Sequence, residues 1–178
     1  MTTTEQTGRQ IAERSLRIMV DGTRADFVEV IHPEAVNREA AKEPPACRGR
    51  GPDAFRATAT WLRRAFSDLA VTVHEAVEQG DLVVLHTTLS GRHTGRIVMY
   101  DVDGRPKQAF PPTGRTFAAT QTHWLRVADG QVIEHWANRD DLGTGAQLGW
   151  IPPSPRYLLR MALATRRARR VARAMRSR

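Results

Sequence analysis

The sequence predicts an α+β fold in which helices precede an antiparallel sheet. Apolar residues recur at helical spacing in the first third of the chain, and from about residue 71 apolar and β-branched residues alternate with polar ones. Helices segregated from strands in this order are typical of the α+β class. A chain of 178 residues can bury one sizeable core, so a single domain with a C-terminal appendage is expected.

The first third of the chain predicts two helices. Residues 8–20 place apolar side chains among polar ones at roughly helical spacing, and Asp21-Gly22 ends this helix. A shorter helix over residues 24–31 ends before Pro33, because the residue preceding a proline avoids the helical region.

A third helix is expected after a charged loop punctuated by Gly and Pro over residues 37–52. Asp53 is predicted to cap this helix, since a side-chain oxygen at that position accepts a free backbone N–H. The residues expected on its buried face are Phe55, Ala59, Leu62 and Phe66.

The second half of the chain changes to a period of two. Residues 71–75 alternate, and Gly80-Asp81 turns the chain into a β-branched strand over residues 82–89, so a hairpin is predicted. Residues 96–114 are rich in Pro and Gly and are expected to form an irregular excursion.

A second hairpin is predicted from residues 117–127 and 131–138, joined by an Asp-Gly turn. Its last strand runs into Trp136 and then into Asp140 and Asp141. A carboxylate held beside a Trp and shielded from water would have a raised pKa, as a general acid or base near neutral pH requires. Chemistry is therefore expected at this strand end, with these two carboxylates as the candidates.

The net charge of +8 belongs to the C-terminal segment. Nine arginines and no acidic residue follow Asp141, which gives +9 there and −1 for residues 1–141. Three interpretations of this basic amphipathic helix stay open: packing on the domain or on a partner subunit, contact with an anionic membrane surface, and contact with nucleic-acid phosphates. A frayed, solvated tail is the structural alternative to all three. The first two are favoured, and nucleic acid is not expected as a partner. The apolar stripe that predicts the helix comprises Tyr157, Met161, Ala164, Ala168, Val171 and Met175.

Cysteine usage and motif content predict a cytoplasmic protein without a cofactor. A single cysteine, Cys47, excludes an internal disulfide, and no N-terminal apolar run resembles a signal peptide. His74, His86 and His135 have no carboxylate at ligand spacing, so no metal site is expected. The sequence has neither a Gly-rich phosphate loop after a strand nor a GxSxG elbow, so nucleotide cofactors and acyl-enzyme chemistry are not expected.

Residues 134–149 combine the pattern E-H-W-x-N-x-D with L-G-x-x-x-Q-L-G. This stretch resembles the C-terminal signature of SnoaL-like polyketide cyclases, a branch of the nuclear-transport-factor-2-like superfamily, and the runs at residues 90–95, 112–115 and 126–130 follow in the order and spacing of that family. The resemblance covers about residues 10 to 150. It implies a domain over residues 1–151 in which N-terminal helices pack on a strongly curved antiparallel sheet to form a cone with one apolar pocket. Residues 152–178, a Pro-rich linker and the Arg-rich helix, lie outside it.

The resemblance also implies roles for individual residues. Asp140 matches the position of the acid/base carboxylate, with capping of the next turn as the alternative, and Asp141 is expected to cap or to pair with an Arg. Gln121 and His123 share one strand face and are predicted to line the pocket, where His123 suits stabilisation of an enolate; a structural, half-buried His is the alternative. The other predicted substrate-binding residues, each also compatible with a purely structural role, are Asn37, Asn138, Trp136 and His93.

The activity that the resemblance implies is a cofactor-independent intramolecular aldol cyclisation of a small, hydrophobic, polyketide-like molecule. The carboxylate would remove a proton next to a carbonyl, and the pocket would bring two carbons of one substrate together. The same residue types would serve an isomerase or a hydrolase. A non-catalytic ligand-binding or scaffolding protein and a membrane-associated adaptor are alternatives from other classes. By analogy with the resembled folds, a homodimer paired through the sheet face is expected.

Overall fold

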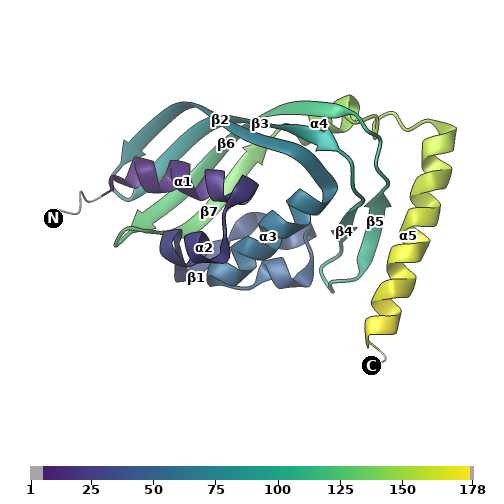
Figure 1. Cartoon of the computed structure of the whole chain (residues 1–178), viewed down its shortest axis with the longest axis horizontal. Coiled ribbons are helices and arrows are strands. Elements are labelled where there is room, and N and C mark those ends of the chain that lie inside the picture. Colours follow the sequence, from purple (N-terminus) through teal and green to yellow (C-terminus); the bar gives the residue numbers. More distant parts are fainter. Residues whose placement is uncertain (1–5, 177–178) are drawn as a thin grey trace.

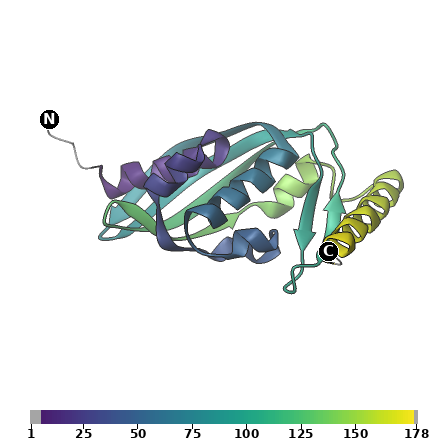
Figure 2. The same ribbon diagram turned by 60° about the horizontal axis from the view of Figure 1, so that its bottom comes forward.

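The computed structural model describes residues 6–176 and has the predicted α+β architecture (Figure 1). Three helices, α1 (Gly8–Asp21), α2 (Arg24–Val30) and α3 (Gly51–Ala65), lie on one face of a five-stranded sheet. A smaller two-stranded sheet and the long helix α5 (Pro155–Arg176) extend the molecule beyond one end of the main sheet, as Figure 2 also shows. The predicted order of helices, sheet and C-terminal basic helix is confirmed.

The main sheet is mixed, whereas the sequence predicted a purely antiparallel one. Its first strand, β1 (Ile31–Asn37), pairs in parallel with β7 (Gln131–Arg139), and the remaining pairs are antiparallel. Strand β1 was missed because Pro33 and a register shift between Ile31 and Val36 remove the alternation that marks a strand. From β1 the strand order continues through β7, β6 (Thr116–Ala128), β3 (Leu82–His93) and β2 (Phe66–Gln79).

Two further segments predicted as irregular carry short regular elements. The excursion at residues 96–114 contains a hairpin of β4 (Ile97–Tyr100) and β5 (Pro106–Phe110). The loop at residues 37–52 contains two 3₁₀ turns, η1 (Arg38–Lys42) and η2 (Pro45–Arg48). These elements were not recognised in the sequence, because each is too short to show a periodic pattern and lies among Pro and Gly residues.

Helix α3 begins two residues before the predicted cap. Arg50 occupies the N-cap position without a side-chain hydrogen bond, and Asp53 lies in the first turn instead. Gly51 has a φ of 76°, and a Cβ there would lie 2.3 Å from the carbonyl oxygen of Pro33, so only glycine fits this contact between α3 and β1. Phe66, predicted on the helix face, is the first residue of β2.

The core divides into two clusters along the long axis of the molecule. The larger cluster fills the space between the three helices and the inner face of the sheet, with Phe27, Ile31, Leu85 and Leu125 among its fully buried members. The smaller cluster lies toward β4, β5 and α4 (Asp141–Gln147). Its buried members are Ala65, Phe66, Ile97, Phe117, Ala119 and Leu148.

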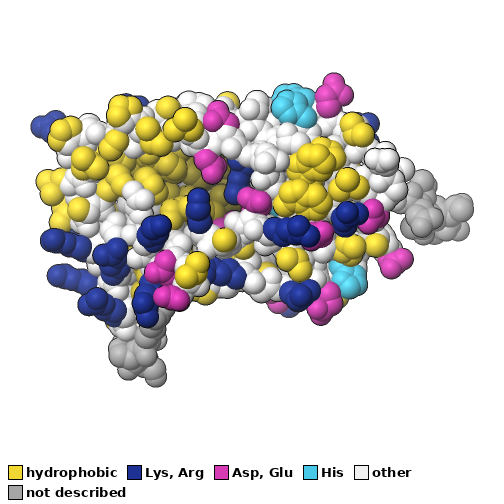
Figure 3. Space-filling view, turned by 180° about the vertical axis from the view of Figure 1, so that it is seen from behind, with side chains coloured by type: hydrophobic (Ala, Val, Ile, Leu, Met, Phe, Trp, Pro, Cys, Tyr) yellow, Lys and Arg dark blue, Asp and Glu magenta, His cyan; other side chains and the backbone are white. Residues whose placement is uncertain are grey.

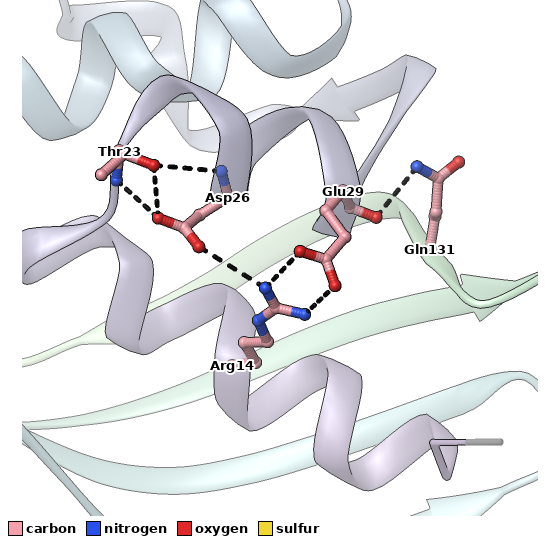
Figure 4. A network of polar contacts seen from close by, with 5 residues as sticks. All are labelled: Arg14, Thr23, Asp26, Glu29 and Gln131. Atoms are coloured by element: carbon pink, nitrogen blue, oxygen red, sulfur yellow. Dashed lines mark hydrogen bonds and ion pairs between the residues drawn. The ribbon is translucent and has the colours of Figure 1, made fainter. Parts of the chain in front are cut away.

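A polar network holds the N-terminal helices together and ties them to the sheet (Figure 4). The guanidinium of Arg14 on α1 donates two hydrogen bonds, of 2.5 and 2.6 Å, to the carboxylate of Glu29 on α2. Asp26, which accepts from the backbone N–H of Thr23 at 2.8 Å, lies 3.5 Å from the same guanidinium. Gln131 at the start of β7 donates to the carbonyl of Glu29 at 3.1 Å. Paired, largely exposed polar groups thus connect α1, α2 and the start of β7.

Helix α5 packs against β5, as the first of the three interpretations of this segment predicted. The hydroxyl of Tyr157 donates to the carbonyl of Pro111 at 3.0 Å, and the hydroxyl of Thr165 accepts from the N–H of Ala109 at 2.9 Å. Arg169 donates to the carbonyls of Pro106 and Lys107, both at 3.1 Å. The predicted apolar stripe holds only in part: Tyr157, Met161 and Ala164 are buried, whereas Val171 and Met175 are exposed, as are Leu158, Leu159 and Leu163.

Candidate functional site

The two faces of β6 and β7 carry different sets of predicted site residues. His123 lies opposite Ala137, and Trp124 lies opposite Trp136, so each pair shares one face. Gln121 and His123 are each only 9% exposed and face the helices, as predicted. Trp124 and Trp136 face the opposite, outer side of the sheet.

A chain of four polar side chains crosses the inner face beneath α3. Nδ1 of His135 lies 3.0 Å from Oδ1 of Asn37, and Nε2 of His135 lies 2.9 Å from Nδ1 of His123. Nε2 of His123 then lies 2.8 Å from Oε1 of Gln121. The edge of the Phe55 ring covers His135, with ring centroids 6.5 Å apart. Three of the predicted site residues, Asn37, Gln121 and His123, are therefore brought together by His135, which the sequence did not single out.

The hydrogen bonds of Asn37 determine which atoms donate and which accept among these four side chains. Oδ1 of Asn37 also accepts the backbone N–H of Glu39 at 3.1 Å, so this atom is an acceptor and Nδ1 of His135 donates to it. In a neutral ring the Nε2 of His135 then accepts from Nδ1–H of His123, which leaves a lone pair on Nε2 of His123. The Gln121 atom at this position, Oε1, is also an acceptor, so this proton order requires the side-chain amide to be flipped, which places its NH₂ group on the lone pair.

Burial keeps both histidines neutral at pH 7. Removal from water, together with the positive charge of Arg139, lowers the pKa of His123 to about 4. The pKa of His135 is lowered well below its ordinary value by the same burial, with smaller contributions from His123 and Arg139. In this tautomer Nε2 of His123 can thus accept a proton in the neutral range once its hydrogen bond to Gln121 is broken.

Arg139 acts electrostatically on the histidine pair and on a buried glutamate, Glu43, and the sequence indicated neither residue. Nη2 of Arg139 is 2.8 Å from Oε2 of Glu39, whose other oxygen accepts the N–H of Ala137 at 3.2 Å. Arg139 also acts electrostatically on Glu43, which is 4% exposed and accepts a 2.5 Å hydrogen bond from Thr58. Burial raises the pKa of Glu43. An isolated glutamate in a loop gives no local pattern, so only the fold reveals this carboxyl group.

Asp140 caps a helix instead of lying in a shielded pocket. Its side chain is exposed, and Oδ1 accepts the N–H of Gly143 at 2.7 Å at the start of α4. The predicted shielding beside Trp136 is absent because β7 ends at Arg139 and the chain turns into α4 at once. Asp141 is also exposed, with Oδ1 4.0 Å from Nε of Arg139. The geometry corresponds to the capping alternative, and a catalytic role for Asp140 stays a prediction.

Trp136 and Asn138 face outward because β7 contains a bulge. The consecutive β6 residues Arg126 and Val127 pair with Glu134 and Val132, so β7 has one extra residue at Ile133. Beyond this point the strand faces are exchanged, and His135 instead of Trp136 continues the inner face that begins at Val132.

The outer face carries an aromatic pair. The rings of Trp124 and Trp136 stack with centroids 6.0 Å apart and an interplanar angle of 8°. Nε1 of Trp124 donates to Oδ1 of Asn138 at 3.3 Å, and the guanidinium of Arg38 lies 5.3 Å from the centroid of the Trp136 ring. Two of the predicted substrate-binding residues therefore belong to a surface outside the inner-face site.

His93 is a core residue and lies apart from the histidine pair. It ends β3, whereas the β3 residue opposite His123 is Leu85. The ring is fully buried, with centroids 5.4 Å from Phe66 and 5.3 Å from Trp150. Nδ1 lies 3.3 Å from Oγ1 of Thr113, and Nε2 has no hydrogen-bond partner within the described part of the chain. Burial lowers the pKa of His93 to about 4.

These buried histidines predict a loss of stability in mild acid. The folded pKa of His93 is about 4 and the unfolded one about 6.5, so the unfolded chain binds more protons and stability falls as the pH drops from 6.5 to 4. The expected loss at pH 5 is about 2 kcal/mol for each of His93 and His123, on the scale of 1.36 kcal/mol per pKa unit. Urea unfolding at pH 7 and pH 5 measures it. His93→Phe should reduce the difference between the two pH values, since Phe keeps the packing without titrating; an unchanged difference would contradict the assignment.

Figure 3 shows a recess lined largely by hydrophobic side chains at the end of the molecule that carries β4, β5 and α5, with Lys and Arg side chains along its lower rim. The smaller core cluster lies toward this end, and several of its large members are only partly buried. These are Trp61, Met99, Phe110 and Trp150. Apolar surface of this kind suits a hydrophobic ligand.

Residues 6–176 contain neither a candidate metal site nor a candidate membrane-spanning helix. Within that range no three His, Cys, Asp or Glu side chains gather closely enough to hold a metal ion. None of the helices in the same range is long and apolar enough to span a bilayer. Cys47 is buried, and burial raises the pKa of its thiol to about 12, so the group stays protonated at neutral pH.

Comparison with known proteins gives consistent matches over the helices and sheet. The family model for SnoaL-like polyketide cyclases matches residues 10–148. Aklanonic acid methyl ester cyclase DnrD from Streptomyces peucetius is 36% identical over 146 residues, which is 82% of this chain and 92% of that protein. Nogalonic acid methyl ester cyclase from Streptomyces nogalater is 33% identical over 129 residues, which is 72% of this chain and 87% of that protein.

Solved structures agree with the sequence matches. TsrD from Streptomyces laurentii aligns with a TM-score of 0.63 and 29% identity, over 79% of this chain and 93% of that chain. IdmH from Streptomyces antibioticus, described as a putative polyketide cyclase, aligns with a TM-score of 0.60 and 25% identity, over 81% of this chain and 99% of that chain. Helix α5 lies beyond the residues that the family model matches.

Proposed function

This chain belongs to the SnoaL-like polyketide cyclase family, and we propose that it closes a ring in a polyketide-like ester by a cofactor-independent intramolecular aldol reaction. The observation that carries the mechanism is the buried chain from Asn37 through His135 and His123 to Gln121 on the inner face of the sheet. Two relatives are named for the methyl esters of aklanonic acid and nogalonic acid. A neutral ester of this kind suits a site whose polar groups are themselves largely uncharged.

The first step is removal of a proton from a carbon between two carbonyl groups of the substrate. Nε2 of His123 accepts this proton through the lone pair that is released when the Gln121 amide turns aside. The displaced NH₂ group of Gln121 can then donate to the enolate oxygen. His135 and Asn37 hold the His123 ring in the tautomer that presents Nε2.

Ring closure follows within the same substrate molecule. The enolate carbon attacks a second carbonyl carbon, a C–C bond forms, and the new alkoxide takes back the proton from Nε2 of His123. Substrate and product are isomers, so the reaction needs neither an oxidant nor a co-substrate. Apolar side chains around the bound substrate would hold the two reacting carbons together, which lowers the barrier by proximity.

A non-catalytic ligand-binding protein is the second candidate, and the exposure of Asp140 favours it. The predicted carboxylate base is not directed into the inner face, and the low pKa of His123 makes this imidazole a weak base. Binding without turnover would need the same apolar inner face and the same polar chain. The two candidate functions differ only in whether the bound ligand reacts.

The test is incubation of the protein with aklanonic acid methyl ester in D₂O. Ring closure would appear as a product of unchanged composition with a new retention time, and proton abstraction as deuterium at the activated carbon above the uncatalysed rate. Both results support the cyclase. Saturable binding of the ester with neither exchange nor product would instead establish the ligand-binding alternative.

The outer face of the sheet supports a further proposal, a homodimer in which this face meets a second copy. The stacked Trp124 and Trp136 are only partly buried, and Val77 on the same sheet is 65% exposed. We expect Trp136→Asp to convert a dimer into a monomer in sedimentation velocity, with Leu142→Asp, at a site off this face, as the control. Monomeric wild type, or equal dissociation by both variants, would contradict the proposal.

Helix α5 supports peripheral contact with an anionic membrane. Its exposed Leu159 and Leu163 lie among arginines, a composition that suits the boundary between headgroups and acyl chains. Co-sedimentation with phosphatidylglycerol vesicles, but not with phosphatidylcholine vesicles, is the expected result. Equal sedimentation with both vesicle types would remove the electrostatic basis of the contact.

A further inference from the structure

A groove of about 470 Å³ runs between α5 and the segments that follow β3 and β5. Arg160 and Arg167 line it from α5, and Arg96 lines it from the connection between β3 and β4. Pro111, Pro112 and Leu163 supply apolar wall. Its volume is within the range of sites that hold small organic ligands.

The positive charge in this groove is not neutralised by the protein. Over residues 6–176, neither Arg96 nor Arg167 makes an ion pair, and the groove lining contains no carboxylate. Arg160 donates one hydrogen bond, of 2.9 Å, to the carbonyl of Pro112 and lies 5.9 Å from the centroid of the Tyr157 ring. Its remaining donors are free to meet a ligand.

A second groove of about 180 Å³ adjoins the first through Arg160. It adds Arg115 from the start of the β6 region, together with the hydroxyl-bearing residues Thr113 and Ser154. Four guanidinium groups therefore lie along one continuous path. Because the sequence after Asp141 contains no acidic residue, this path has no local counter-charge from the C-terminal segment.

The packing of α5 fixes the backbone that carries two of these arginines, Arg160 and Arg167. Tyr157 and Thr165 bond to the backbone at Pro111 and Ala109, and Arg169 bonds to Pro106 and Lys107. These contacts hold the side of α5 that faces β5, and the groove lies next to that side. Arginines on a helix held against the domain bind an anion more tightly than the same charges on a flexible tail, because less backbone conformational entropy is lost.

We propose that the two grooves form a binding site for a phosphate-bearing ligand, with the phosphate held by Arg96, Arg160 and Arg167 and the apolar part lying along Leu163. Guanidinium forks match the oxygens of phosphate in geometry as well as in charge. The phosphate can come from a lipid headgroup or from a free phosphorylated molecule, and the two sources are separable by experiment. This site is independent of the inner-face chemistry, and Arg160 and Arg167 lie on a helix outside the family match.

The test compares two double variants of equal charge. Arg96→Gln with Arg167→Gln removes two groove arginines, whereas Arg166→Gln with Arg170→Gln removes two exposed arginines of α5 that do not line the groove. Binding of inorganic pyrophosphate is followed by calorimetry, and binding to phosphatidylglycerol vesicles by co-sedimentation. We expect the groove variant to lose at least 10-fold in affinity and the control variant to stay within 2-fold of wild type.

The pattern of results distinguishes the sources and can overturn the proposal. Loss of both pyrophosphate and vesicle binding in the groove variant indicates a lipid headgroup, and loss of pyrophosphate binding alone indicates a free phosphorylated ligand. Equal losses in the two variants would mean diffuse attraction to a basic helix, and absence of binding by wild type would mean no site; either overturns the proposal. Ring closure by all three proteins should be the same, so a failure here leaves the cyclase mechanism untouched.

Discussion

Replacement of His123 by Gln is expected to lower kcat for ring closure by at least about 100-fold, the range in which positioned general acids and bases contribute. Gln can replace the hydrogen bonds to His135 and Gln121 in part, but it offers no lone pair of comparable basicity. Substrate affinity should change little, because the apolar inner face remains. Turnover of aklanonic acid methyl ester, with binding measured separately, checks this split between kcat and KM.

A second variant tests whether Asp140 is the base instead of His123, and a third is a control. Asp140→Asn should keep turnover within a few-fold of wild type, since an Asn oxygen can still accept the N–H of Gly143. His86→Gln, on the exposed outer side of β3, controls for loss of a histidine as such. Full turnover in His123→Gln together with loss in Asp140→Asn would reverse the assignment and make the carboxylate the base.

Gly95→Ala is expected to destabilise the fold by roughly 3 kcal/mol or more, at or beyond the upper end of overpacking effects. A Cβ on Gly95 would lie 1.8 Å from the carbonyl oxygen of Arg64 and 2.9 Å from its carbon. The N–H of Gly95 also donates to the carbonyl of Ala65 at 2.9 Å, so the chain cannot move away without loss of this bond. The methyl group therefore meets backbone at the end of α3, which yields less easily than a side chain.

The midpoint of urea unfolding measures this loss, with Gly114→Ala as the matched control. Gly114 has a φ of 73° but nothing within 4 Å of an added Cβ. Ala there bears only the cost of a left-handed backbone, about 1 kcal/mol. If the two variants unfold at the same urea concentration, the contact between Gly95 and α3 is not the constraint that the structure indicates.

Much of the fold could be predicted from the sequence because its long elements carry clear periods. The helices at residues 8–20 and 24–31 and the hairpin about Asp129-Gly130 are close to the observed elements, and the family resemblance supplied the arrangement. Strand β1 was not recognisable, because Pro33 and a register shift interrupt it. The β4 and β5 strands are too short for a period to appear, so their pairing depends on tertiary contacts.

The candidate site was only partly predictable for a related reason. Alternation correctly placed Gln121 and His123 on one buried face, because no bulge lies between them. The same rule fails on β7, where the extra residue Ile133 moves Trp136 outward and brings His135 inward. A bulge is a property of pairing between two strands, so neither strand alone reveals it. Glu43 was missed because its environment is assembled from a loop and a helix that are distant in space until the chain folds.

The hydrogen bonds from α5 to β5 have a consequence for solubility. β5 has only one strand neighbour, β4, so its other edge offers unpaired backbone groups that could template the addition of a strand from another molecule. Thr165 and Arg169 occupy the N–H of Ala109 and the carbonyls of Pro106 and Lys107, and the helix above them blocks access. The basic helix thereby covers the unpaired edge of β5. A chain shortened before Pro155 would expose this strand edge to other molecules.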